Sequence, residues 1–306
     1  MKKFVLFSLT LLCVACIGGK YPLPEEEKRP GNEQIDPDPD PDPDPDPDPD
    51  PGTDPPGTEE PGEFPAPEAV TLCGAFAENF SARESAIFDF QYRSGADDFR
   101  YYSGYPSLSE RNQQVLMLRL DPQVPAGVEE GAVLSTPEAT FSGSYAFRLR
   151  IPSIRRAQPK VTAHAAVRIL GTDAHYGDSE VAFQWTLSDP TQLQMRTNAG
   201  IEANIPKNSF TVNGLSGFDA SARLYNYGFD WHADRIDWWM QSTAGGEKTT
   251  LWTLSEDVPM IPGRFRIEYW HEAAVPPLYP FEMEVDDVSY TPFQDEIDAW
   301  TQKYFK

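Results

Sequence analysis

Two side chains suited to catalysis stand four residues apart in the segment 180–184, Glu-Val-Ala-Phe-Gln. Side chains alternate across a β-strand, so Glu180, Ala182 and Gln184 share one face of an extended segment and the bulky apolar residues share the other. Two long side chains at this spacing can lean together until their ends are about 5 Å apart, the separation between nucleophile and general acid in retaining hydrolysis of a glycosidic bond. Here the second group is an amide, which cannot supply the proton.

Such a strand needs neighbours, and short runs of alternating apolar and polar residues recur through residues 69–290. Turn residues bound these runs and helical patterns are few, so the segment predicts an all-β sandwich of two antiparallel sheets. Its length of about 220 residues is enough for a substantial core. The clearest runs are residues 114–120, 145–151, 264–270 and 281–286.

The C-terminal segment 291–306 is predicted to form an amphipathic helix. Thr291 can cap its N-terminus, with Pro292 in the first turn. The apolar side chains then fall on one helical face, namely Phe293, Ile297, Trp300 and Tyr304. We expect this face to pack on the domain's own surface rather than on a partner.

The N-terminus predicts a bacterial lipoprotein. Residues 1–15 are typical of a secretory signal, with two lysines and then a dozen apolar residues, too few to span a bilayer. The run Leu-Cys-Val-Ala-Cys at 12–16 resembles a lipobox, which predicts cleavage before Cys16 and its acylation. The alternative is an ordinary cleaved signal with an incidental cysteine. Acylation would anchor the protein in a membrane, with residues 16–35 as a tether.

Residues 36–68 predict an extended stalk. Eight consecutive Asp-Pro pairs fill residues 36–51. Alternate prolines enforce a polyproline-type rod without a core, and repulsion between the aspartates extends it further. Carboxylates on such a rod cannot converge on one ion, so a structural calcium ion is possible but not indicated. We expect the stalk to hold the domain away from an outer membrane, displayed at the cell surface.

Charge and composition exclude several classes of partner. The 306 residues carry 48 acidic and 25 basic groups, for a net charge of −23, which disfavours nucleic acid and anionic lipid surfaces. After acylation of Cys16 and removal of the signal, Cys73 would be the last thiol, and the four histidines lack metal-ligand spacing. We therefore expect no disulfide within the chain, no cysteine- or histidine-based metal site and no cofactor. We also expect a monomer.

Several segments, taken in order, resemble glycoside hydrolase family 16, the group of laminarinases, lichenases and xyloglucanases. The segment 178–185 is similar to the family's D-E-I-D-I-E-F strand, and 194–200 is similar to the H-T-N-x-x-x-G that follows. The resemblance implies a concanavalin A-like jelly roll with a cleft on its concave face. It covers nearly all of residues 69–290, since further similar segments are 78–80, 131–136, 141–152, 227–239, 259–260, 265–270 and 285–290.

When the family's residues are matched to this sequence position by position, the resemblance implies a role for three residues of the segment 180–184. Glu180 matches the family's nucleophile, Gln184 stands in the place of the general acid/base, and Ala182 replaces the aspartate between them. Ala146 also stands where the family has a glutamate, and Asp178 is the only spare acid on that face. General acid assistance contributes roughly 10²–10⁴-fold, so the replacements predict a catalytically degenerate site.

A cleft that has lost catalysis can still bind a polysaccharide. In jelly-roll clefts of this kind, sugar rings stack on aromatic side chains and sugar hydroxyls form hydrogen bonds with polar side chains. The candidates for ligand binding are Trp185, Asn198, Trp231, Trp238 and Trp270.

Three functions are open at this point. The first is a surface lipoprotein whose family-16-like cleft binds a polysaccharide without cleaving it. The second is an active retaining endo-β-glycanase that uses a substituted acid. The third is a structural or adhesin domain that keeps the fold and has lost the cleft. The lipid anchor and the stalk fit all three.

Overall fold

The computed structural model describes residues 67–81, 85–94, 105–108, 114–120, 130–154, 160–171, 179–199, 207–242, 246–272 and 274–305, all within the second of the two units into which the chain divides, Gly62–Lys306. The predicted signal, Cys16, the tether and nearly all of the stalk lie outside the described residues, as does Asp178. Those expectations stay predictions.

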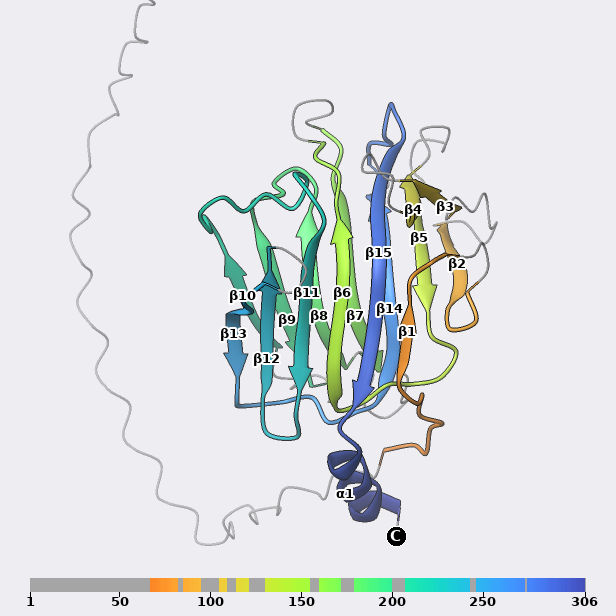
Figure 1. Cartoon of the computed structure of the whole chain (residues 1–306), viewed down its shortest axis with the longest axis vertical. Coiled ribbons are helices and arrows are strands. Elements are labelled where there is room, and N and C mark those ends of the chain that lie inside the picture. Colours follow the sequence, from red (N-terminus) through yellow and green to blue (C-terminus); the bar gives the residue numbers. More distant parts are fainter. Residues whose placement is uncertain are drawn as a thin grey trace, which may run out of the picture. The chain divides into compact units, whose positions relative to one another are not determined.

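The described chain folds into two antiparallel sheets that face each other (Figure 1), which confirms the predicted all-β sandwich. In pairing order the first sheet contains β13 (Thr249–Leu254), β12 (Ile236–Gln241), β11 (Tyr225–Trp231), β6 (Gly143–Arg150), β15 (Phe281–Pro292), β4 (Gln114–Leu120) and β3 (Tyr105–Leu108), and β1 (Phe76–Glu78) also pairs with β15. The second sheet contains β10 (Lys207–Val212), β9 (Leu193–Asn198), β8 (Glu180–Thr186), β7 (Ala163–Gly171), β14 (Gly263–His271), β5 (Glu130–Ser135) and β2 (Asp89–Ser94).

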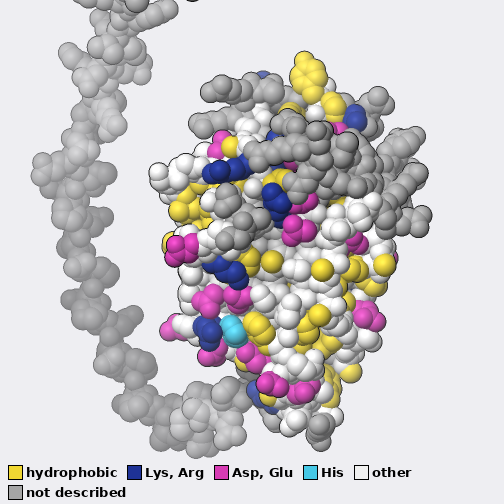
Figure 2. Space-filling model, viewed as in Figure 1, with side chains coloured by type: hydrophobic (Ala, Val, Ile, Leu, Met, Phe, Trp, Pro, Cys, Tyr) yellow, Lys and Arg dark blue, Asp and Glu magenta, His cyan; other side chains and the backbone are white. Residues whose placement is uncertain are grey.

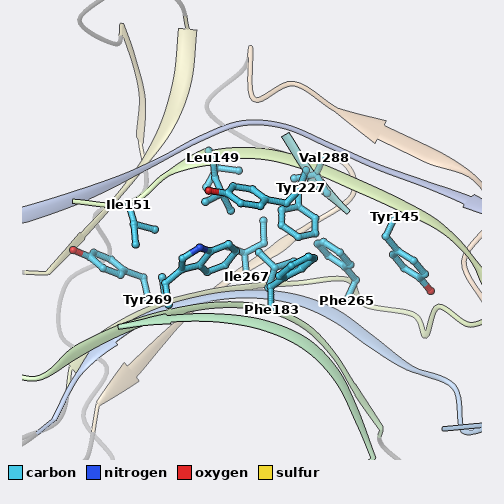
Figure 3. Packing of buried hydrophobic residues seen from close by; sticks show 14 of the residues in the cluster. Tyr145, Leu149, Ile151, Phe183, Tyr227, Phe265, Ile267, Tyr269 and Val288 are labelled. Atoms are coloured by element: carbon cyan, nitrogen blue, oxygen red, sulfur yellow. The ribbon is translucent and has the colours of Figure 1, made fainter. Parts of the chain in front are cut away.

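The core lies between the two sheets and is strongly aromatic (Figure 3). Strand β6 alternates buried and partly exposed residues along its whole length, because period-2 alternation sends every second side chain into the core. Phe183 from the second sheet and Tyr227 from the first meet with ring centroids 5.9 Å apart. Burying a large apolar side chain contributes about 1.5–3 kcal/mol, so this layer holds the sheets together and fixes which side chains face outward.

The C-terminal helix α1 spans Gln294–Phe305 and follows β15 directly. It begins three residues later than the sequence pattern suggests, because Thr291 and Pro292 still pair with β6 at Ser144 and Gly143. No helix in the described part of the chain has the length and apolar character that crossing a membrane requires.

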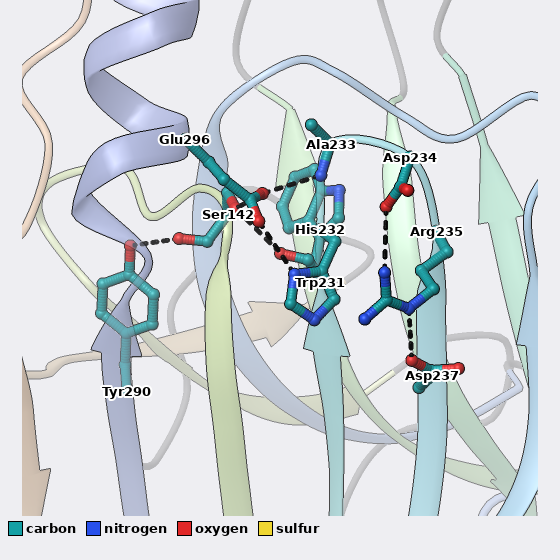
Figure 4. A network of polar contacts seen from close by, with 9 residues as sticks. All are labelled: Ser142, Trp231, His232, Ala233, Asp234, Arg235, Asp237, Tyr290 and Glu296. Carbon is teal, nitrogen blue, oxygen red and sulfur yellow. Dashed lines mark hydrogen bonds and ion pairs between the residues drawn. The ribbon is translucent and has the colours of Figure 1, made fainter.

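Helix α1 docks on the domain's own surface. Its Glu296 accepts hydrogen bonds from Ser142 Oγ at 2.6 Å and from the backbone N–H of Ala233 at 2.8 Å, and lies 2.9 Å from His232 Nδ1 (Figure 4). On the apolar face, Trp300 packs against Phe141 with ring centroids 4.9 Å apart. The helix therefore closes one end of the sandwich.

Candidate functional site

Strand β8 carries the candidate catalytic residues on the outward face of the second sheet. Pairing places Glu180 beside Asn198 of β9 on one side and Leu170 of β7 on the other. A groove of about 540 Å³ opens over these strands, lined by Arg168, Leu170, Glu180, Gln194, Arg196, Thr197, Asn198, Lys207, Asn208 and Ser209. A smaller hollow of about 200 Å³ continues along the same face, lined by Gln184, Thr186, Gln192, Gln194 and Thr211.

The Glu180 carboxylate is held between two arginines. It is buried, with 8% of its surface exposed, and its Oε1 lies 3.3 Å from Nη1 of Arg168. Its Oε2 lies 3.7 Å from Nη2 of Arg196, which is an ion-pair distance and not a hydrogen bond. Two cations therefore flank the one group that corresponds to a nucleophile.

Arg196 also binds the residue that stands in the place of the general acid. Its Nη1 donates a hydrogen bond of 2.7 Å to Oε1 of Gln184. Because Arg196 pairs with Ala182 in the strand register, its guanidinium reaches Glu180 and Gln184 from a position opposite the residue between them. One cation thus connects Glu180 and Gln184, the two positions at which a retaining mechanism would need carboxyl groups.

Ala182 lies between the two arginines. It is 1% exposed, and its register partners are Arg168 on β7 and Arg196 on β9. A methyl side chain leaves both guanidinium groups free to reach past it to Glu180. Ala182 and the two arginines therefore belong to one arrangement.

The arrangement continues onto β14. Nη2 of Arg168 donates to Oε2 of Glu268, which is 1% exposed, and Nε of Arg266 lies 3.2 Å from the other oxygen of Glu268. Both carboxylate oxygens of Glu268 therefore face guanidinium groups, an arrangement that suits an acceptor rather than a proton donor. The sequence alone does not point to Arg168, Arg196, Glu268 or Arg266, because only strand pairing brings them to β8.

Three of the tryptophans expected to bind a ligand lie in the core instead. Trp185, Trp231 and Trp238 are each 1% exposed or less. Trp185 stacks on Phe183, and Trp238 stacks on Trp252 with ring centroids 4.6 Å apart. Their faces are covered by protein, so the expectation that they hold sugar rings is wrong.

The two other candidates do lie on the outward face. Asn198, which is 8% exposed, lines the groove beside Glu180. Trp270 on β14 is half-buried beside His164, with ring centroids 5.3 Å apart, and does not line the groove. The groove is therefore walled mainly by polar and charged side chains.

Two chemical limits follow for the described site. Among the described residues that line the groove and the adjoining hollow, Glu180 is the sole carboxylic acid. The described residues also contain no group of three or more histidine, cysteine, aspartate or glutamate side chains arranged to hold a metal ion. The described groove offers hydrogen-bond donors, acceptors and positive charge, but no second carboxyl group beside Glu180.

No protein-family model matches the sequence, and no curated protein sequence matches it. Solved structures do match in fold. A β-glucanase from Bacillus licheniformis aligns with 72% of this chain and 99% of its own, at 18% identity and a TM-score of 0.52. A β-1,3-1,4-glucanase (lichenase) derived from a mouse hindgut metagenome aligns with 72% of this chain and 100% of its own, at 18% identity and a TM-score of 0.54.

A third match carries the family designation. The glycoside hydrolase family 16 endo-glucanase from Bacteroides ovatus aligns with 70% of this chain and 99% of its own, at 9% identity and a TM-score of 0.53. These similarities concern the fold, because the identities are low. The domain has the jelly-roll sandwich of family 16 glycoside hydrolases, as the sequence resemblance implied.

Proposed function

We propose that this protein is a surface-anchored lipoprotein whose groove on the second sheet binds a polysaccharide without hydrolysing it. The observation that carries the proposal is the bridge from Arg196 to both Glu180 and Gln184. A retaining mechanism needs a nucleophile and a proton donor around the bond that breaks. Here a permanently charged guanidinium connects the two positions, and one of them is an amide.

A polysaccharide suits this groove for two reasons. The groove and the adjoining hollow lie over the neighbouring strands β8, β9 and β10 and share Gln194, so they offer a chain of sugar units one continuous surface. The walls of the groove present amide and hydroxyl groups, including Asn198, Gln194 and Ser209, which can donate to and accept from sugar hydroxyls. The fold shared with glucanases supports this choice of ligand class.

The anchoring part of the proposal rests on the N-terminal sequence. The lipobox-like run ending at Cys16 supports acylation, and the Asp-Pro repeats of 36–51 support a stalk between membrane and domain. A domain held outward on an outer membrane would meet polysaccharides too large to enter the cell. We propose that it works as a monomer.

An active retaining endo-β-glycanase is the second candidate, because Glu180 is retained and faces the groove. It would require a proton donor near Gln184. Glu268 is the described carboxylate on the same transverse row of the sheet, two strands away, but arginines hold both its oxygens. Asp178 lies outside the described residues.

Glycan-array binding and a reducing-end assay on the same preparation test the proposal. The wild-type chain should bind at least one polysaccharide and release no reducing ends from it. Gln194→Ala should weaken binding by about five- to tenfold, because one or two hydrogen bonds to sugar hydroxyls are lost. Asn226→Ala, a polar change on the outward face of the first sheet, is the matched control and should bind as wild type.

Two results would count against non-catalytic binding. Turnover that disappears in Glu180→Gln would establish the glycanase instead. If the protein bound no glycan on the array, the remaining candidate would be a structural or adhesin domain.

A further inference from the structure

The outward face of the second sheet is positively charged, although the protein as a whole carries −23. Strand registers place five cationic side chains on this face between β14 and β10, against two carboxylates. The cations are Arg168, Arg196, Lys207, Arg264 and Arg266, and the carboxylates are Glu180 and Glu268.

The surplus is concentrated in the groove. Its lining contains Arg168, Arg196 and Lys207, with Glu180 as the one described carboxylate. Lys207 is exposed and forms no ion pair with any described residue. The side chain of Arg196 is 41% exposed, and its 3.7 Å approach to Glu180 is too long for a hydrogen bond. Nη1 of Arg196 is held by Gln184 at 2.7 Å, so Nη2 of Arg196 and the ammonium group of Lys207 are the donors that a negatively charged ligand can reach without breaking a tight protein contact.

The first sheet has the opposite balance on its outward face. Figure 2 views the molecule from that side, where acidic side chains lie among lysine and arginine side chains. The registers place five carboxylates there against three cations, and the ion pair of Asp286 with Arg148 adds a sixth carboxylate. The carboxylates are Asp230, Asp237, Glu282, Glu284, Asp286 and Asp287, and the cations are Arg119, Arg148 and Arg150. The positive groove is thus a local feature of one face.

We propose that the groove selects polysaccharides that carry sulfate or carboxylate groups, an inference that rests on the polysaccharide binding proposed above. Nη2 of Arg196 can donate a charge-assisted hydrogen bond to either anion, and the exposed ammonium group of Lys207 adds a second positive charge on the same groove. Repulsion from the acidic remainder of the chain is screened beyond about 8 Å at physiological salt, so these contacts govern binding at short range. The surplus positive charge adds no affinity for neutral glycans.

The test compares glycans that differ in charge on related backbones. Full-length protein is titrated with laminarin against laminarin sulfate, with agarose against carrageenan, and with polygalacturonate as a carboxylate-bearing chain. We expect the charged member of a pair to bind at least about tenfold more tightly, since each charge-assisted hydrogen bond contributes that much. Its affinity should fall between about 50 mM and about 200 mM salt. Tighter binding of the sulfated glycans than of polygalacturonate, or the reverse, identifies which anionic group the groove recognises.

Single substitutions locate the effect. Arg196→Gln should weaken binding of the charged glycan about tenfold, and Lys207→Gln about threefold, because Lys207 is more exposed to solvent. Lys248→Gln is the matched control, since Lys248 lies over the ring of Trp239 on the other sheet. It should leave the affinity unchanged. Lys207→Gln alters an exposed side chain, so it tests the inference even where Arg196→Gln fails to fold.

The outcomes separate this inference from the proposed function. Tight binding of a neutral glycan, with no gain from charge and no effect of Arg196→Gln or Lys207→Gln, overturns charge selection and leaves polysaccharide binding intact. Absence of binding to any member of the panel overturns both.

Discussion

Arg196 decides how the residues of the active-site strand can act. Its guanidinium reaches both Glu180 and Gln184 from the neighbouring strand. The side chains at 182, 184 and 196 therefore act together, because Arg196 pairs with Ala182 in the strand register.

Restoring hydrolysis should require all three positions. Ala182→Asp with Gln184→Glu adds two carboxylates around Arg196, which would pair with them, so this double variant should release no reducing ends. Adding Arg196→His should open the site and raise hydrolysis of the bound glycan at least about 10²-fold over the double variant, the gain expected from general acid assistance. Glu180→Gln in the triple variant is the control and should abolish the activity. Turnover by the double variant alone would contradict the blocking role of Arg196.

At the same scale, the sequence predicted part of the site and missed part. Alternation along 180–186 correctly places Val181 and Phe183 in the core and Glu180 on the outward face. The same alternation assigns Trp185 to the core, against its selection as a ligand platform. The arginines could not be predicted, because each is 12 residues from its partner on β8 and the strand register joins them.

One carboxylate, that of Glu296, links helix α1 to the sandwich by hydrogen bonds. Burial opposes ionisation of Glu296, but hydrogen bonds from Ser142, His232 and the backbone N–H of Ala233 outweigh it, and together they lower the pKa of Glu296 below its ordinary value of 4.5. A carboxyl group with a lowered pKa in the folded state stabilises that state above its unfolded pKa. The stabilisation is lost as the pH falls through the lower, folded value.

Glu296→Gln should therefore destabilise the domain at neutral pH and matter less in acid. We expect a loss of about 1–2 kcal/mol in the free energy of unfolding at pH 7, from weakened charge-assisted hydrogen bonds to a partly exposed group. The difference from wild type should shrink as the pH falls below about 4.5, where wild type also loses the charge. Urea unfolding at several pH values measures it. Asp298→Asn, an exposed change on the same helix, is the control, and an equal effect there would contradict a specific role for Glu296.

The elements themselves were more predictable than their ends. The apolar face of 291–306 predicted an amphipathic helix, and Ile297 and Trp300 are buried. The predicted start of the helix was wrong. Thr291 and Pro292 are residue types that favour a helix cap and first turn, but they pair with β6 and so belong to β15. The pairing could not be predicted from the local sequence, because Ser144, the partner of Thr291, lies 147 residues earlier in the chain.

At the scale of the whole molecule, charge is divided by region. Residues 36–68 carry nine aspartates and four glutamates without a basic residue, so −13 of the net −23 belongs to the predicted stalk. The groove keeps a positive surplus within an acidic chain. We propose that repulsion between these carboxylates keeps the stalk extended.

The anchor is the remaining whole-molecule prediction. If Cys16 is acylated, the wild-type protein should partition into the detergent phase and Cys16→Ala should enter the aqueous phase or stay unprocessed, because the acyl chains supply the membrane affinity. Cys73→Ala is the matched control and should partition as wild type, since Cys73 is half-buried in the domain, where its thiol donates to the carbonyl of Glu138. Protease added to intact cells should release the domain by cutting the stalk if it faces outward. Unchanged partitioning of Cys16→Ala would show that another part of the chain holds the protein at the membrane.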